Sequence, residues 1–319
     1  MFLMLMIRRA LQTSQTDASL IRLTASFMLL ILLTACGGDS STSPVQPLPA
    51  LPTVDELPAY EVIGSGPMVV VLATDMQETL YDSATTDTIV LRLLSAGYSV
   101  MSLDLPCHGA DAEPGVQPLD CWARRITAGD QDIFLSFCAG LSGVLDRLDA
   151  SAVGMVGISR GAYVAITCAA YDERFRDLAL EIPVTDLNYL TEFKSRPVDQ
   201  TIFGTDQYVP HISNRTILVR IGKDDERVGT LLAVAFAKKV GSTLELTDAV
   251  GHDTAEDGST IAWLQAHPFY GGGSSQQSSA SHAPHDRVPC RTNDQPNHSA
   301  RIVTLYFDLR ARVFEKNTR

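Results

Sequence analysis

The stretch Ala152-Val153-Gly154-Met155-Val156-Gly157-Ile158-Ser159-Arg160-Gly161-Ala162-Tyr163 decides the fold. An apolar run leads into Gly157-x-Ser159-x-Gly161, and small residues follow. This order predicts a buried strand, a tight turn and a helix packed close to the sheet, because glycine leaves room where a side chain would collide. The turn would present the Ser159 hydroxyl at the carboxyl end of the strand, near backbone N–H groups. The motif alone is common, so the rest of the chain has to supply partners for the serine.

Strand and helix patterns alternate on both sides of this stretch. The run Met68–Ala73 is rich in valine and continuously apolar, as expected of a strand buried on both faces of a parallel sheet. Further strands are predicted at 60–63, 99–103, 178–182, 216–221 and 243–247, and helices at 85–96, 122–148, 160–170, 230–240 and 259–267. This alternation predicts a mostly parallel, doubly wound sheet with helices on both faces.

Composition narrows the class of protein. The chain has 319 residues, of which 45% are hydrophobic, so it can bury a large core. Its formal net charge of −12 argues against nucleic acid as a partner, because phosphate binding needs a basic face. The sequence contains no His-x-x-x-His or Cys-x-x-Cys pair and no phosphate-binding Gly-Lys-Ser/Thr loop. We therefore expect neither a metal nor a cofactor.

The N-terminus predicts export. Arginines precede the apolar run 25–33, which is too short to span a bilayer but suits the core of a signal peptide. The following Leu33-Thr34-Ala35-Cys36 resembles the lipobox of bacterial lipoproteins. We expect residues 1–35 to be removed and Cys36 to be lipidated, which would hold the protein in the bacterial cell envelope, at the outer membrane.

Three further segments follow the expected lipidation site. Residues 36–58 are rich in Gly, Ser and Thr and then in Pro, which predicts a flexible tether. Residues 59–270 carry the strand and helix patterns, and a loop-rich insertion at 183–213 is predicted to form a small lid with apolar substrate contacts from Tyr189, Phe193, Phe203 and Tyr208. The tail 271–319 begins with a Gly/Ser/Gln-rich run and is predicted to be disordered.

Candidate partners for the serine follow it in a meaningful order. Asp225 lies in Gly-x-x-Asp-x-x-Val after one predicted strand, and Gly251-His252 follows the last strand. Because the carboxyl ends of parallel strands share one edge of a sheet, we expect Ser159, Asp225 and His252 to converge. A neutral imidazole can accept the serine proton, and a carboxylate can orient that imidazole. Asp224 competes with Asp225 for the acid role, and the spacing favours Asp225.

These motifs make residues 60–270 resemble the α/β-hydrolase superfamily. Within it, Gly157-x-Ser159-Arg160-Gly161, Pro183–Leu187 and Asp225-Glu226-Arg227-Val228 look like the esterase-like branch related to prolyl oligopeptidases. The resemblance implies a three-layer fold with a mostly parallel central sheet. It also implies Ser159 as nucleophile, His252 as general base and Asp225 as the acid of a catalytic triad.

The same resemblance implies an oxyanion hole beside the serine. One donor would be the Arg160 N–H, and the other is expected in the loop Thr74-Asp75-Met76, at the Met76 N–H. Many relatives have His-Gly in this loop, so the Asp75 carboxylate is a departure. Two roles stay open for the Arg160 side chain, binding of a substrate carboxylate or a local salt bridge.

Cysteines complete the set of candidate residues. Cys107 and Cys121 flank a long loop, and we expect a disulfide between them in an exported protein. Cys138 and Cys168 fall in apolar helices, where we expect free buried thiols. His108, in Asp-x-Pro-x-His-Gly, is expected to serve a structural turn.

The sequence favours a carboxylesterase that cleaves small acyl esters through an acyl-enzyme intermediate. A serine peptidase related to prolyl oligopeptidase is the alternative with the same chemistry. A non-catalytic surface lipoprotein that retains the fold is an alternative of another class. The expected partners are a small ester or peptide substrate and the membrane, while the oligomeric state is left open.

Overall fold

The computed structural model describes residues 46–82, 87–254 and 258–268. Its contacts divide the chain at Pro47/Leu48, and the fold described below belongs to the second unit. The expected signal peptide (1–35), the lipidation site Cys36 and the tail 271–319 lie outside the described residues.

The described residues form a seven-stranded sheet of order β1-β3-β2-β4-β5-β6-β7. The edge strand β1 is antiparallel to β3, and every other neighbouring pair is parallel. The side chains of β3 and β4 are buried throughout, and β4 is accordingly apolar at every position. The two serines of β3 are buried because their hydroxyls donate to backbone carbonyls, Ser99 to Gly66 (3.0 Å) and Ser102 to Val71 (2.9 Å). The strands are β1 (Tyr60–Gly64), β2 (Met68–Leu72), β3 (Ser99–Leu103), β4 (Val153–Ile158), β5 (Phe175–Glu181), β6 (Thr216–Gly222) and β7 (Thr243–Thr247).

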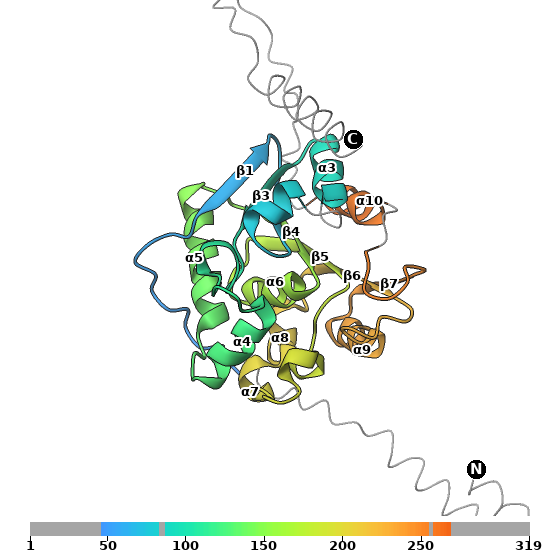
Figure 1. Ribbon diagram of the computed structural model, residues 1–319. Helices are drawn as coiled ribbons and strands as arrows, with labels where there is room; N and C mark the ends of the chain where they lie inside the picture. Colours follow the sequence, from blue (N-terminus) through green and yellow to red (C-terminus); the bar gives the residue numbers. More distant parts are fainter. Residues whose placement is uncertain (1–45, 83–86, 255–257, 269–319) are drawn as a thin grey trace, which may run out of the picture. The chain divides into compact units, whose positions relative to one another are not determined.

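Helices cover both faces of this sheet (Figure 1). Helices α3 (Asp87–Ser95) and α10 (Ser259–Ala266) contact each other, α3 packing on β3 and α10 on β5. On the other face, α6 (Arg160–Tyr171) packs on β2, β4 and β5, and α9 (Thr230–Val240) packs on β6 and β7. The remaining helices are α4 (Pro118–Thr127), α5 (Ile133–Arg147), α7 (Gln200–Phe203) and α8 (Val209–Ile212), with short turns η1 (Glu78–Asp82), η2 (Gly109–Asp111), η3 (Leu187–Tyr189), η4 (Thr191–Phe193) and η5 (Thr205–Gln207). The predicted three-layer α/β-hydrolase fold is confirmed.

Two glycines set how closely α6 approaches the sheet. A Cβ atom on Gly161 would lie 2.0 Å from the Leu72 carbonyl oxygen, and one on Gly157 would lie 2.6 Å from the Ala162 Cα. Neither position can hold a side chain unless the backbone moves. The motif around Ser159 therefore has glycines because α6 touches β4 at Gly157 and the end of β2 at Gly161.

The segment before β1 is packed, in contrast to the free tether expected up to residue 58. Leu48, Leu51 and Leu57 are partly buried against the core. Two glycines of α5 leave room for the end of this segment: a Cβ atom on Gly140 would lie 2.9 Å from the Pro58 ring, and one on Gly143 would lie 2.6 Å from a Leu57 methyl group. The packed domain thus begins about ten residues earlier than composition indicated, because scattered leucines in a Pro-rich stretch can pack without a regular element.

The insertion at 183–213 consists of short helical turns whose aromatic residues mostly face inward. Phe193, Phe203 and Tyr208 are at most 4% exposed and belong to the main core. Phe203 packs edge-on against Phe134 of α5, and Tyr208 against Tyr171 of α6. The predicted lid contacts are therefore wrong for these three residues, which anchor the insertion. Tyr189, which is 41% exposed, is the one aromatic of the four that remains accessible.

Two disulfides occur among the described residues. Cys107 and Cys121 are bonded, as expected. Cys138 of α5 and Cys168 of α6 are also bonded, with their Cα atoms 4.9 Å apart, so the expectation of free thiols is wrong. Both cysteines are buried where the two helices pack together, and the distance between two helices is information that burial patterns do not contain.

Candidate active site

Ser159 occupies a sharp turn between β4 and α6. Its backbone has φ 54° and ψ −115°, a region that non-glycine residues rarely occupy. Hydrogen bonds to the end of β5 and to the loop after it hold the turn: the Ser159 N–H donates to the Glu181 carbonyl (2.9 Å), and the Val184 N–H donates to the Ser159 carbonyl (3.1 Å). Such conformations cost about 1–3 kcal/mol and persist where the surroundings fix them, often at active sites.

Asp225 lies in the loop after β6 and is 2% exposed. Its Oδ1 accepts hydrogen bonds from the Arg227 N–H (2.9 Å) and the Val228 N–H (3.1 Å), which leaves Oδ2 for another partner. Burial alone would raise the pKa of this carboxyl. The hydrogen bonds from His252, Val228 and Arg227 outweigh burial, so the pKa lies below its ordinary value and Asp225 is ionised at neutral pH.

His252 joins the serine to this carboxylate. Its Nδ1 lies 2.8 Å from Asp225 Oδ2, and its Nε2 lies 2.8 Å from Ser159 Oγ. An ionised carboxylate can only accept, so Nδ1 carries the proton and Nε2 accepts from the serine hydroxyl. The loop that carries His252 crosses the end of β6 at Gly222. A side chain at this position would block the crossing, because its Cβ atom would lie 2.9 Å from the Ala249 carbonyl oxygen.

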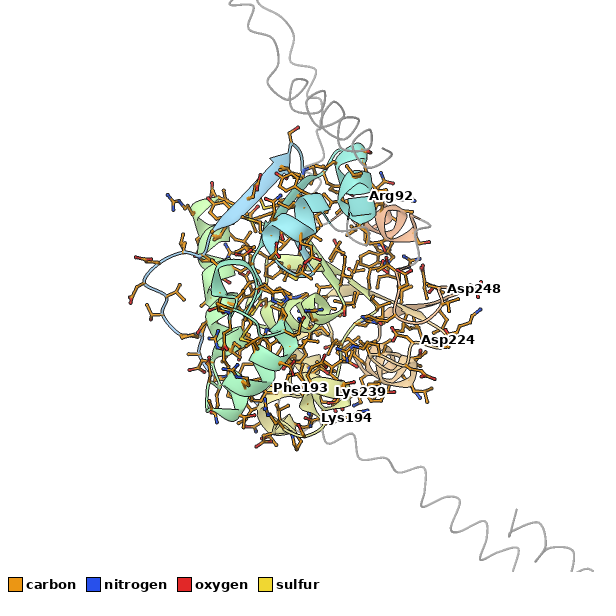
Figure 2. All side chains as sticks on the ribbon, in the orientation of Figure 1. Arg92, Phe193, Lys194, Asp224, Lys239 and Asp248 are labelled. Carbon is orange, nitrogen blue, oxygen red and sulfur yellow. A yellow bond between two sulfur atoms is a disulfide. The ribbon has the colours of Figure 1, made fainter. Side chains whose placement is uncertain are left out.

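The structure thus brings Ser159, His252 and Asp225 together in the expected order. The His252 side chain is 26% exposed, so a substrate can reach the serine–histidine pair. Asp224, the competing acid, is exposed, and it lies at the outer edge of the molecule in Figure 2. The geometry therefore gives the acid position to Asp225.

The loop after β2 differs from expectation. The Met76 N–H donates to Asp104 Oδ1 (2.8 Å), so it is not available as the predicted oxyanion donor. Thr74 N–H points to Thr79 Oγ1 (3.3 Å), which leaves the Asp75 N–H as the one N–H of Thr74–Met76 without an acceptor among the described residues. The Asp75 N–H therefore replaces the Met76 N–H as the candidate for the second donor.

The Asp75 carboxylate is turned toward a helix start. Its Oδ1 accepts from the Glu78 N–H (2.7 Å), as an N-terminal capping residue does. This hydrogen bond engages the carboxylate at the start of η1. The spacing Asp75-x-x-Glu78 is that of a capping box, a signal that sequence reasoning could have used.

Asp104 is a residue of the site that sequence reasoning missed. Its second oxygen accepts from the Ala110 N–H (3.0 Å), so one carboxylate ties the loop after β2 to the loop after β3. Gly109 packs directly on it, because a Cβ atom there would lie 1.9 Å from Asp104 Oδ2. The Asp-x-Pro-x-His-Gly segment therefore holds the loop that carries Asp75 in place through the hydrogen bonds of Asp104.

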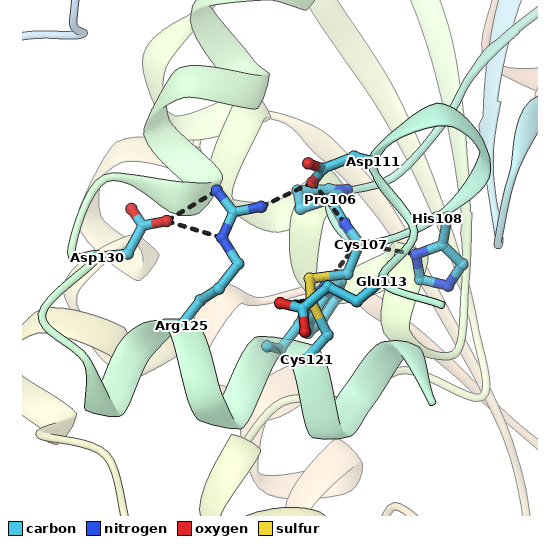
Figure 3. Close-up of polar contacts among 9 residues, drawn as sticks. Pro106, Cys107, His108, Asp111, Glu113, Cys121, Arg125 and Asp130 are labelled. Carbon is cyan, nitrogen blue, oxygen red and sulfur yellow. Dashed lines mark hydrogen bonds and ion pairs between the residues drawn. A yellow bond between two sulfur atoms is a disulfide. The ribbon is translucent and has the colours of Figure 1, made fainter. Parts of the chain in front are cut away.

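The Arg160 side chain contacts His108. Its Nη1 lies 3.2 Å from His108 Nε2, and His108 Nδ1 donates to the Pro106 carbonyl (2.8 Å). The His108 pKa lies below its ordinary value, mainly because of burial, so the ring is neutral and its Nε2 accepts from the guanidinium. The disulfide Cys107–Cys121 fixes the loop on which His108 is carried, as Figure 3 shows.

A second arginine lies near Arg160. Arg227, from the loop after β6 that also carries Asp225, pairs with Glu192 Oε1 of η4 (2.6 Å). Burial lowers the pKa of Arg160, the positive charge of Arg227 lowers it further, and Glu78 and Glu192 oppose this. Of the two sequence-based roles for Arg160, a local salt bridge is not seen: no carboxylate of the described residues lies within ion-pair distance of it.

The described segments hold neither a cluster of metal ligands nor a helix that could span a membrane. There, no three His, Cys, Asp or Glu side chains are grouped as they would be around a metal ion. None of the helices in these segments is long and apolar enough to cross a membrane.

Comparisons with known proteins bear on the fold. No protein-family model and no curated protein matches this sequence. Solved structures similar to it include acetyl xylan esterase 1 from Thermoanaerobacterium sp. JW/SL YS485 (TM-score 0.47, 19% identity, covering 66% of this chain and 78% of that one). An esterase from Pyrococcus furiosus has TM-score 0.47 and 20% identity, covering 64% and 81%. A cold-adapted esterase from an Arctic intertidal metagenomic library has TM-score 0.47 and 17% identity, covering 64% and 83%. Similarity at this level carries no argument, so the fold is taken from the topology above and the chemistry from the site itself.

Proposed function

We propose that this protein is a serine hydrolase that cleaves small carboxylic esters. The observation that carries the proposal is the continuous hydrogen-bonded series Ser159 Oγ, His252 Nε2, His252 Nδ1 and Asp225 Oδ2, with 2.8 Å at each of its two junctions. A serine hydroxyl becomes a useful nucleophile when a base within hydrogen-bond reach accepts its proton. These distances meet that requirement before any substrate is bound.

Each residue has a definite step in the reaction. Ser159 Oγ attacks the ester carbonyl while His252 Nε2 takes the hydroxyl proton, and Asp225 stabilises the imidazolium that forms. The N–H groups of Arg160 and Asp75 would stabilise the oxyanion. His252 then gives the proton to the leaving alkoxide, which departs and leaves an acyl-serine. Water activated by the same histidine releases the acid and restores Ser159.

Hydrolysis of short p-nitrophenyl esters, compared between wild type and Ser159→Ala, tests this function. The variant is expected to lose essentially all wild-type hydrolysis while keeping its unfolding temperature. Matched p-nitroanilides separate an esterase from a peptidase, since an esterase cleaves the ester far faster than the amide. Equal, slow ester hydrolysis by wild type and variant would contradict the enzyme function and favour the non-catalytic alternative.

The same proposal includes its location, an envelope-anchored lipoprotein. The lipobox at Leu33–Cys36 motivates it, and disulfides are stable in an oxidising compartment. In bacteria that express the gene, palmitate should be incorporated at Cys36, and Cys36→Ser should move the protein from the membrane to the soluble fraction. A Cys36→Ser variant that still sediments with membranes would contradict the anchor.

A further inference from the structure

The guanidinium of Arg160 lies above the centre of the sheet's carboxyl edge. It reaches His108, in the loop after β3, and it interacts electrostatically with Arg227, in the loop after β6. Strand β4, which ends at Ser159, lies between β3 and β6 in the sheet. The side chain therefore extends over the same edge at which the serine, histidine and aspartate converge.

This guanidinium is half-buried, yet no carboxylate of the described residues lies close enough to form an ion pair with it. Its one hydrogen bond among the described residues goes to the neutral ring of His108. A buried or half-buried arginine ordinarily pairs with a carboxylate, because removing water from an unpaired charge is costly. Arg160 has instead a second guanidinium, that of Arg227, among its electrostatic neighbours.

The nearby carboxylates are engaged elsewhere. Asp104 accepts two backbone N–H bonds, Asp225 holds His252, and Asp75 caps the turn at Glu78. Glu192 gives Oε1 to Arg227, and its buried Oε2 has no hydrogen-bond partner among the described residues. Glu192 and Glu78 thus act on Arg160 only from beyond ion-pair distance.

We propose that Arg160 binds a carboxylate carried by the substrate, so that the preferred substrates are esters whose non-reacting end is a carboxylate. The inference rests on the proposed hydrolase function. A carboxylate matches the planar fork of a guanidinium, and a single negative charge matches one arginine that has no carboxylate within ion-pair distance among the described residues. Arg160 directly follows Ser159 along the chain, so a group bound by its guanidinium lies no farther from the Ser159 turn than the length of one arginine side chain.

Two matched substrate pairs test this inference. One pair carries the charge in the acyl part, p-nitrophenyl hydrogen adipate and its methyl ester. The other pair carries it in the alcohol part, p-acetoxybenzoate and p-acetoxybenzamide. The quantity measured is the ratio of kcat/KM for the charged substrate to that for the neutral one, in wild type and variants. Intrinsic differences between substrates cancel when this ratio is compared between enzymes.

Arg160→Gln is expected to lower the ratio about 10- to 100-fold for at least one pair, as loss of a charge-assisted hydrogen bond does. Its backbone N–H is retained, so hydrolysis of the neutral substrate should change much less. Arg160→Lys should keep part of the preference. Glu192→Gln should raise the ratio, because it removes a carboxylate that competes for the arginines. The control Arg147→Gln, on the exposed end of α5 before β4, should leave the ratio unchanged.

The outcomes separate this inference from the proposed function. An unchanged ratio in Arg160→Gln for both pairs, with equal losses on charged and neutral substrates, would show that Arg160 only supports His108 and would overturn the inference alone. Wild-type enzyme that neither hydrolyses the esters nor reacts with a fluorophosphonate at Ser159 would overturn the proposed function, and this inference with it.

Discussion

At the scale of single residues, Ser159 combines an unfavourable backbone conformation with a favourable set of partners. The turn holds φ at 54° because hydrogen bonds to Glu181 and Val184 fix it on both sides. His252 and Asp225 arrive from separate loops and still meet the serine at hydrogen-bonding distance. The backbone strain at the turn and the convergence of the three side chains point to the same atom, Ser159 Oγ.

Asp225→Asn tests the acid of this arrangement. An amide at this position would favour the wrong tautomer of His252 and could not stabilise the imidazolium, so kcat should fall about a thousandfold or more. The matched control is Asp224→Asn, one residue earlier and exposed, which should retain wild-type kcat. Ester hydrolysis measures both variants. Similar losses in the two, or a larger loss in Asp224→Asn, would contradict the assignment of the acid.

The convergence of Ser159, His252 and Asp225 was predictable from sequence because its signals are local. A glycine-bracketed serine and two motifs at predicted strand ends each depend on a few adjacent residues. Met76 and Asp104 show the limit of prediction from local signals. The Met76 N–H donates to a carboxylate 28 residues away, and no local pattern contains that contact. Cys138 and Cys168 show the same limit, because local patterns place both in buried helices without giving the distance between the helices.

At the scale of elements, the close packing of helix α6 on the sheet depends on glycine. Helix α6 passes so near β2 that Gly161 faces the Leu72 carbonyl with no space between them. The insertion contributes in another way, because Phe203 and Tyr208 fix its turns to α5 and α6. The buried aromatics fix the insertion to the core, and the sequence could not distinguish this anchoring from lid contacts because aromatic residues serve both roles.

Gly161→Ala should be strongly destabilising for this reason. The new methyl group would collide with backbone, so α6 or β2 must move, at a cost of at least about 2 kcal/mol. Gly143→Ala in α5 is the control: its Cβ would meet only the end of the Leu57 side chain, which can turn away. Urea unfolding measures both free energies of unfolding. A Gly161→Ala variant as stable as Gly143→Ala would contradict the close packing.

At the scale of the whole molecule, a disulfide and a network of ion pairs and hydrogen bonds link α5 to α6 and to the residues that follow α6. The disulfide Cys138–Cys168 links their buried faces. At the end of α6, Asp172 accepts from Ser142 of α5 (2.7 Å) and pairs with Arg174 (2.6 Å), which also reaches Asp146 of α5. Burial alone would raise the pKa of Asp172, but the hydrogen bonds from Arg174 and Ser142 outweigh burial and lower it.

This lowered pKa predicts a pH-dependent contribution to stability. A carboxyl whose folded pKa is depressed stabilises the fold above its unfolded pKa, about 3.9, and the contribution is lost as the pH falls through the folded pKa. Asp172→Asn should therefore reduce the free energy of unfolding by about 1–3 kcal/mol at neutral pH and by progressively less below about pH 4. Denaturant unfolding of wild type and variant across this range measures the difference. A difference that stayed constant or grew on acidification would contradict the ionised network.

The central claim is that Ser159 is an activated nucleophile, and a fluorophosphonate probe tests it most directly because the probe reacts with activated serines without resembling a particular substrate. The protein is incubated with the probe, digested, and the modified residue located by mass spectrometry. The account predicts one labelled site at Ser159, no label in Ser159→Ala, and much slower labelling in Asp225→Asn than in Asp224→Asn. Absence of label from folded wild-type protein, or label at a residue other than Ser159, would contradict it.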